Sequence, residues 1–246
     1  MSDKKVGLIG CGAIGTVLAE AIERKIVVCD ELVVYDFDQP KAQRLKSSLN
    51  FPVTVVGSLE ELLASKPTVI VEAASQQAVK AYVPKIVSSG PELIVMSTGG
   101  LLDLHVDLSR VHLPSGAIGG LDALSSAGLA GVEEIVLTSR KNPKALGRDN
   151  KEEKVVYEGY AKEAARQFPR EMNVAATLAL TVKPAKVKVR VVSDPAVKRN
   201  THEIQAKWRF GEMFLRFAND PHPDNPSTSA LAAWSAIKLL QSILKN

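Results

Sequence analysis

Short apolar runs alternate with amphipathic segments along the first hundred residues of the chain. The runs are continuously apolar, as in strands that are covered on both faces, and the segments between them have helical spacing. The predicted strands are 6–9, 32–35, 54–56, 68–72 and 93–96. The predicted helices are 16–24, 40–49, one that begins with the capping-box pattern at Ser58 and Glu61, and 76–87. This alternation predicts an α/β domain with a doubly wound parallel sheet of the Rossmann type.

The pattern changes at 114–124, where three glycines and a proline indicate a crossing to a second domain. Beyond it we predict strands at 135–139, 187–192, 203–209 and 213–217, helices that end at Leu129 or span 161–168 and 173–182, an exposed loop at 147–154, and a tight turn at 211–212. This order favours an α+β domain with an open, mostly antiparallel sheet. A final helix, capped by Thr228 or Ser229 and running to Leu244, is expected to pack on the first domain. The predicted domains are therefore 1–116 plus 227–246, for dinucleotide binding, and 117–226, for substrate binding and dimerisation.

Composition narrows the class of protein. The chain has 246 residues, of which 46% are hydrophobic and 24% are charged, as in a globular protein. The net charge of +4 is spread among 31 basic and 27 acidic residues, so we expect neither nucleic acid nor a membrane as partner. No apolar run is long enough for a membrane span and no leader pattern precedes the first strand, so we expect a cytoplasmic protein. Two cysteines, Cys11 and Cys29, make neither a metal-ligand cluster nor a disulfide framework, and no metal is expected.

The first strand leads into Gly10-Cys-Gly-Ala-Ile-Gly15, and each glycine has a role in a dinucleotide-binding turn. Gly10 allows the turn, Gly12 lets the backbone approach a pyrophosphate, and Gly15 lets the helix pack closely on the strand. The second strand ends in Asp36, where a carboxylate would bind an adenine ribose. We assign these residues to the cofactor NAD, with NADP as a further possibility: Gly10, Gly12, Ala13, Ile14, Gly15 and Asp36.

Ligands of such a sheet lie beyond the carboxyl ends of its strands. This places two small-residue loops, 73–75 and 97–100, along the cofactor cleft, and we assign Ala74 and Ser75 to cofactor binding. Among the four histidines, His105, His112 and His222 have no partner at motif spacing, and we expect them at the surface. His202 stands between a polar turn and a strand of the second domain, where an imidazole that titrates near neutral pH suits a general acid or base. The alternative is a structural histidine.

Four segments together resemble the L-aspartate dehydrogenase family: 10–15, 114–124, 168–180 (Phe-Pro-Arg-Glu-Met-Asn-Val-Ala-Ala-Thr-Leu-Ala-Leu) and 200–204 (Asn-Thr-His-Glu-Ile). The resemblance runs from end to end. It implies that the protein oxidises L-aspartate to iminoaspartate with NAD(P). Iminoaspartate hydrolyses to oxaloacetate and ammonia or feeds NAD biosynthesis. We expect the enzyme to be a homodimer. The resemblance also implies that His202 is catalytic and that Ala117 and Asn173 contact the cofactor. Two departures from the family pattern, Glu171 and Gly100, bear on the substrate.

An amino dicarboxylate needs sites for its two carboxylates. The residues Ser227, Thr228 and Ser229 at a helix start, and the amides of Ser115, Gly116 and Ala117, are candidates for anion binding. Lys198 and Arg199 are near His202 in the sequence, and these possibilities stay open. Alternative functions are a related small dehydrogenase, of the homoserine dehydrogenase or sugar oxidoreductase type, and a dinucleotide-sensing protein without catalysis.

Overall fold

The computed structural model describes residues 4–169, 172–222 and 225–245, and for Pro226 and Ser227 it describes the backbone alone. The described chain divides into two compact units, 1–114 with 233–246 and 115–232. The boundaries thus fall after 114 and 232, compared with 116 and 226 in the sequence-based proposal. Each unit has its own sheet, and the two are treated separately below.

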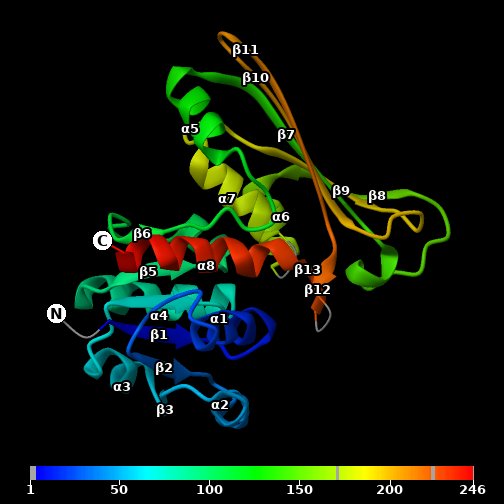
Figure 1. Cartoon of the computed structure of the whole chain (residues 1–246). Coiled ribbons are helices and arrows are strands. Elements are labelled where there is room, and N and C mark those ends of the chain that lie inside the picture. Colours follow the sequence, from blue (N-terminus) through cyan, green and yellow to red (C-terminus); the bar gives the residue numbers. More distant parts are fainter. Residues whose placement is uncertain (1–3, 170–171, 223–224, 246) are drawn as a thin grey trace. The chain divides into compact units, whose positions relative to one another are not determined.

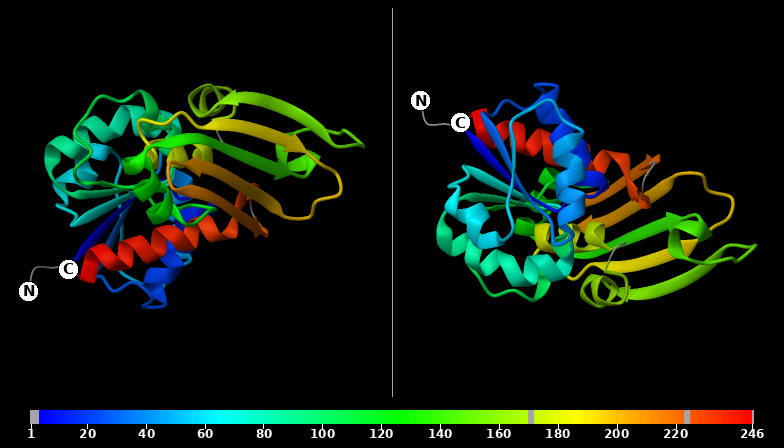
Figure 2. Two further views of the ribbon diagram at one scale, coloured as in Figure 1. Left: turned by 90° about the horizontal axis from the view of Figure 1, so that it is seen from above. Right: turned by 90° about the horizontal axis from the view of Figure 1, so that it is seen from below.

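Six of the described strands form the sheet of unit 1, all parallel, in the order β3-β2-β1-β4-β5-β6. The strands are β1 (Lys5–Ile9), β2 (Glu31–Tyr35), β3 (Val53–Val55), β4 (Val69–Glu72), β5 (Glu92–Val95) and β6 (Val111–His112). The helices between them are α1 (Ala13–Glu23), α2 (Gln39–Ser47), α3 (Leu59–Ala64), α4 (Gln76–Ser89) and the 3-10 helix η1 (Thr98–Asp103). Helices lie on both sides of this sheet (Figure 2), which explains why the central strands are buried and mostly apolar.

Local sequence signals account for several of these elements. The capping box predicted before α3 forms in part. The Ser58 hydroxyl accepts the N–H of Glu61 at 3.1 Å, while the Glu61 carboxylate accepts the N–H of Gly57, the residue before the N-cap, at 2.8 Å. The last helix, α8 (Ala230–Lys245), joins unit 1 from residue 233 onward. Its Gln241 amide donates to the carbonyl of Ile26 at 2.9 Å, so the C-terminal helix packs on the first domain as expected.

Unit 2 contains a five-stranded sheet in the order β11-β10-β7-β9-β8 within the described residues. Its strands are β7 (Val132–Lys141), β8 (Lys154–Tyr160), β9 (Lys188–Ser193), β10 (Asn200–Trp208) and β11 (Gly211–Asn219). Only the β7/β9 pair of this sheet is parallel, so the sheet is mostly antiparallel. Three helices, α5 (Leu121–Ala130), α6 (Ala161–Gln167) and α7 (Asn173–Thr181), lie on one side of it (Figure 1). The remaining described elements of this unit are η2 (Pro143–Leu146), β12 (Pro221–His222) and β13 (Asn225–Ser229).

Two details of unit 2 differ from the sequence prediction. The turn between β10 and β11 lies at Arg209-Phe210 instead of 211–212, because Gly211 already pairs with Trp208 in the ladder. The predicted exposed loop 147–154 ends in β8, a strand that the hydrophobic pattern does not show. The burial of β8 is irregular and its register with β9 shifts between Val155 and Tyr157, so its sequence lacks a clean alternation.

Candidate active site

The turn between β1 and α1 is held by two glycines that no other residue could replace without a shift. Gly10 has φ +97°, and a Cβ on it would lie 2.6 Å from the carbonyl oxygen of Ala73. A Cβ on Gly15 would overlap the carbonyl oxygen of Gly10. The N–H of Gly10 donates to the carbonyl of Tyr35 at 2.9 Å, which joins the turn to the end of β2. Protein packing therefore accounts for both glycines.

Gly12 differs from these two glycines because packing does not require it. A Cβ on Gly12 would meet no atom of the described residues within 4 Å, and the residue is exposed. It is the N-cap of α1, whose first turn receives no side-chain cap within the described chain. The N–H groups of this turn include those of Ala13 and Ile14, and they lie at the positive end of the helix dipole. An open glycine at an uncapped helix start fits a pyrophosphate.

Asp36 lies beside the glycine turn and is fixed by two backbone groups. Its Oδ2 accepts the N–H of Cys11 at 2.7 Å, and its Oδ1 accepts the N–H of Asp38 at 2.8 Å. A carboxylate has about four acceptor positions, so each oxygen keeps capacity for a hydroxyl donor. Asp36 can therefore bind the two hydroxyls of an adenine ribose while it holds the turn in place. Cys11 is a structural residue, because burial raises the pKa of its thiol to about 12.

A cavity of about 410 Å³ opens next to Asp36. One wall comes from the turn and the end of β2, and the other comes from the β4–α4 connection. Its lining residues are Ile9, Gly10, Tyr35, Asp36, Phe37, Ala74, Ser75, Gln77, Ala78, Ala81 and Tyr82. The Tyr35 and Tyr82 rings meet edge to face with centroids 6.0 Å apart. The cavity thus combines an apolar wall with one carboxylate, as an adenosine site requires, and it contains the predicted residues Ala74 and Ser75.

Glu72 positions this wall although the sequence pattern places it only at the end of a strand. The side chain is fully buried, and its Oε1 accepts the N–H groups of Ala74 and Ser75 at 2.8 and 3.0 Å. Its Oε2 accepts the N–H of Ser97 at 3.0 Å. Burial raises the pKa of Glu72, and the backbone donors oppose that shift. Glu72 therefore connects the two loops that were predicted to border the cofactor.

The 97–100 loop itself is buried. A Cβ on Gly100 would lie 2.7 Å from both the carbonyl oxygen of Gln76 and the Cβ of Val79. This residue, one of the two departures from the family pattern, thus has a packing reason: η1 contacts α4 too closely for a side chain. The other departure, Glu171, lies outside the described residues.

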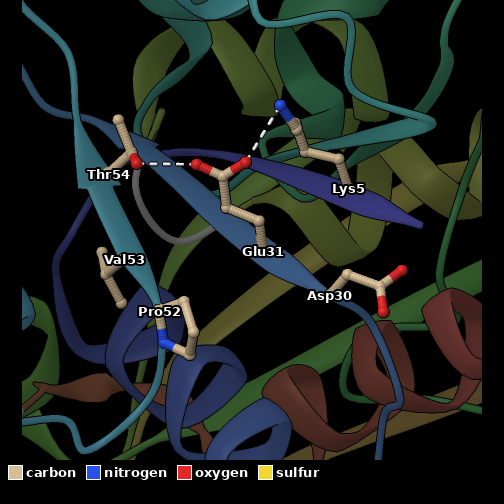
Figure 3. Close-up of a pocket in the computed structure, with 6 residues that line it drawn as sticks. All are labelled: Lys5, Asp30, Glu31, Pro52, Val53 and Thr54. Atoms are coloured by element: carbon tan, nitrogen blue, oxygen red, sulfur yellow. Dashed lines mark hydrogen bonds and ion pairs between the residues drawn. The ribbon is translucent and has the colours of Figure 1, made fainter. Parts of the chain in front are cut away.

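A second hollow, of about 470 Å³, lies at the starts of β1, β2 and β3 (Figure 3). Glu31 is its central group, and it binds the Lys5 ammonium at 2.9 Å and the Thr54 hydroxyl at 2.6 Å. These partners hold the pKa of Glu31 below its usual range. The polar groups satisfy one another, and the hollow is at the end of the strands opposite to the glycine turn, so it is not the cofactor site.

In unit 2, the environment of His202 moves the pKa of its imidazole far from the ordinary value. The residue lies within β10 rather than before it, and it is only 2% exposed. Its Nδ1 is 3.0 Å from the hydroxyl of Ser139, the residue directly opposite on β7. Burial, with a smaller contribution from the charge of Lys141, lowers the pKa of His202 to about 3. Burial thus places the pKa of His202 well below the neutral range in which a free histidine titrates.

The other predicted residues of unit 2 occupy varied positions. Ser115, Gly116 and Ala117 precede α5; Gly116 has φ +66°, and the buried Ala117 accepts the Asn219 amide at 2.8 Å through its carbonyl. Asn173 is the first residue of α7. The triad Ser227, Thr228 and Ser229 ends β13, so Ser229 alone directly precedes α8.

The remaining cations and histidines are placed as follows. Lys198 and Arg199 are exposed, and Arg199 pairs with Asp220 at 2.9 Å. His105 is exposed as expected, whereas His222 is buried, and His112 has an acidic partner, Glu92, at 2.6 Å. Among the described residues, no group of three or more His, Cys, Asp or Glu side chains is placed to hold a metal ion. No described helix has the length and apolar composition of a membrane span.

Family models match both units of the chain. The NAD-binding domain of homoserine dehydrogenase matches residues 10–111, and the C-terminal domain of aspartate dehydrogenase matches residues 122–243. With the strand order of unit 1 and its open glycine turn, these matches define the protein as a dehydrogenase that uses a nicotinamide dinucleotide, NAD or NADP.

Relatives extend the match over nearly the whole chain. The L-aspartate dehydrogenase of Archaeoglobus fulgidus is 43% identical and covers 97% of each chain, and that of Methanothermobacter thermautotrophicus is 39% identical over 98% of this chain and 96% of its own. The chain belongs to the L-aspartate dehydrogenase family. The crystal structure of aspartate dehydrogenase from Thermotoga maritima has a TM-score of 0.77 at 31% identity, with 98% and 96% of the chains covered. A myo-inositol dehydrogenase from Lactobacillus casei, at 12% identity and TM-score 0.60 over 99% of this chain and 86% of its own, shares the fold.

The glycine turn gives a prediction with a matched pair of variants. Gly12→Ala is expected to weaken NADH binding at least about tenfold, because its methyl group enters the space of the pyrophosphate, while stability changes by less than about 1 kcal/mol. Gly15→Ala is expected to lower the free energy of unfolding by about 1–3 kcal/mol or more through overlap with Gly10. Fluorescence titration and urea unfolding measure the two effects. If Gly12→Ala bound NADH as tightly as wild type, the assignment of Gly12 to the cofactor site would be wrong.

The pKa of His202 gives a prediction about stability and pH. Its folded pKa of about 3 lies below the ordinary 6.5, so between these values the unfolded chain binds more protons. The contribution of neutral His202 is therefore complete above pH 6.5 and is lost as the pH falls, by about 1.4 kcal/mol per unit. His202→Asn should unfold with a shallower pH dependence than wild type between pH 7 and pH 4.5. The exposed His105→Asn is the control, and equal slopes in all three proteins would contradict the low pKa.

Proposed function

We propose that this protein oxidises L-aspartate with NAD to iminoaspartate, which water converts to oxaloacetate and ammonia. The observation that supports this most is the relation to L-aspartate dehydrogenases, which extends through both units at up to 43% identity. A bound nicotinamide would supply the hydride acceptor. In unit 1, Gly12 and the first turn of α1 would hold the pyrophosphate, and Asp36 would hold the adenine ribose.

His202 is the proposed base. Its Nδ1 meets the Ser139 hydroxyl, and in the tautomer in which Nδ1–H donates to that oxygen, Nε2 carries the lone pair. This Nε2 would take a proton from the substrate ammonium, so that the neutral amine can assist loss of hydride from Cα. The imidazolium would then release this proton to bulk water, and the neutral Nε2 would take a proton from the water that attacks the imino carbon. Ser139 acts through His202, as a positioning residue.

Other residues have proposed roles in binding. Ala117 and Asn173 are proposed to contact the cofactor, as the family resemblance implies. Backbone groups of Ser115 and Gly116, and the triad Ser227, Thr228 and Ser229, are candidates for substrate binding. The homodimer and the cytoplasmic location stay predictions.

The role of His202 is tested by turnover. NADH formation from L-aspartate is expected in wild type, and His202→Ala should lose roughly 10²- to 10⁴-fold in kcat, the usual contribution of a positioned proton-transfer group. NADH affinity should hardly change, because the glycine turn and Asp36 belong to unit 1. His105→Ala, at an exposed histidine, serves as the matched control for His202→Ala.

The outcomes separate the competing functions. A folded His202→Ala protein with wild-type kcat would refute the base assignment and leave a bound water or a lysine as the base. Turnover of another amino acid or of a polyol in place of aspartate would favour a related dehydrogenase. Tight NADH binding without turnover of any substrate in the panel would favour a dinucleotide sensor.

Cofactor preference is a further expectation. Asp36, with Asp38 two residues on, would face a 2′-phosphate with acidic charge. At about 4 Å a pair of like charges costs about 1 kcal/mol even in water, so kcat/KM should be on the order of tenfold higher with NAD than with NADP. Asp36→Ala should narrow this difference. Steady-state kinetics with both cofactors measure it, and a wild-type preference for NADP would refute the assignment.

A further inference from the structure

One face of the unit 2 sheet carries a row of buried polar side chains. From Ile135 to the end of β7 the burial alternates strictly, so Ser139 and Lys141 share the buried face with Ile135 and Leu137. The register places Ser139 opposite His202 of β10 and Lys141 opposite Ser193 of β9. The ammonium-bearing side chain of Lys141 therefore lies on the same face as the imidazole of His202, one pair further along the ladder.

Lys141 is unusual among the lysines of the chain. It is 2% exposed, and lysine is almost never buried to this extent without a specific reason. Its backbone is fixed, since its carbonyl accepts the N–H of Asp194 at 2.9 Å beside the β7/β9 ladder. Its charge also acts on His202, because it contributes to the low pKa of that imidazole. Lys141 and His202 thus share one face of the sheet, and the charge of the lysine disfavours protonation of the imidazole.

Neighbouring cations are less suited to bind a substrate anion. Arg140 faces the side of the sheet opposite to His202, because burial alternates along this part of β7. Lys198 is exposed. Of the described cations considered for this role, Lys141 is the one that is both buried and coupled to His202.

We propose that the Lys141 ammonium binds one carboxylate of a dicarboxylic substrate beside the imidazole of His202. The proposal rests on the proposed function, which makes His202 the base and an amino dicarboxylate the substrate. A substrate whose amine reaches His202 brings its carboxylates close to this row. Binding there makes Lys141 a determinant of specificity for dicarboxylates over monocarboxylates.

The test uses two unreactive probes with NADH present, succinate and butyrate, which have the same chain length but two and one carboxylates. Their dissociation constants are measured on the full-length protein by calorimetry. Lys141→Met should raise the dissociation constant of succinate at least about 30-fold, which is the lower range for loss of one partner of a buried charge pair. It should also remove the preference for succinate over butyrate. Lys141→Arg should keep most of this preference. Lys207→Met, an exposed lysine of β10, is the matched control.

Each outcome decides one question. A Lys141→Met protein that binds NADH normally and keeps the wild-type preference for succinate overturns the inference, as does a wild type without this preference. If Lys141 had a purely structural role, Lys141→Met would weaken the binding of succinate and of butyrate to the same extent, and this result would also overturn the inference. If Lys141→Met does not fold, the same measurements are made on Lys141→Gln, which removes the charge but keeps a polar group at the end of the side chain. Should wild type fail to oxidise aspartate while the preference still depends on Lys141, the carboxylate site stands and the proposed substrate is wrong.

Discussion

The dinucleotide end of unit 1 depends on the close approach of three backbone segments at Gly10. The turn after β1 contacts the start of α1 through Gly15, and it contacts the β4–α4 connection through Ala73. Neither contact leaves room for a side chain, so the helix start, the end of β2 and the loop after β4 converge on one place. Asp36 and Glu72 then complete this arrangement, because each accepts backbone N–H groups that the convergence leaves without a strand or helix partner. Cofactor binding follows from this backbone geometry more than from any single side chain.

Much of unit 1 could be predicted from sequence because its signals are local. Each buried parallel strand is a continuous apolar run, the glycines stand at fixed offsets, and the Ser58 capping box spans four residues. Unit 2 was predictable in class but less in detail. Its strands pair across long separations, and β8 lacks the alternation that would reveal it. The predicted turn was displaced by two residues because Gly211 was assigned to the turn, whereas it opens β11. Register decides such cases, and register depends on partner strands.

The chemical residues that the sequence did not reveal are those whose environment comes from such pairing. His202 was found as a candidate, but its burial and its contact with Ser139 follow from the β7/β10 register across 63 residues. Lys141 lies beyond the end of the predicted strand 135–139, so the alternation that places it with Ser139 could not be applied to it. Glu72 did have a signal, an acidic residue that closes a fully apolar strand. A buried carboxylate in that position requires donors, and the neighbouring loops supply them.

The charges around His202 connect the proposed chemistry to the proposed substrate. An imidazole with a pKa of about 3 is a weak base, and burial is the larger cause of that low pKa. The charge of Lys141 is the smaller cause, so a carboxylate bound at its ammonium would oppose that part of the shift. A dicarboxylate would therefore make His202 a stronger base than a substrate that lacks the second carboxylate.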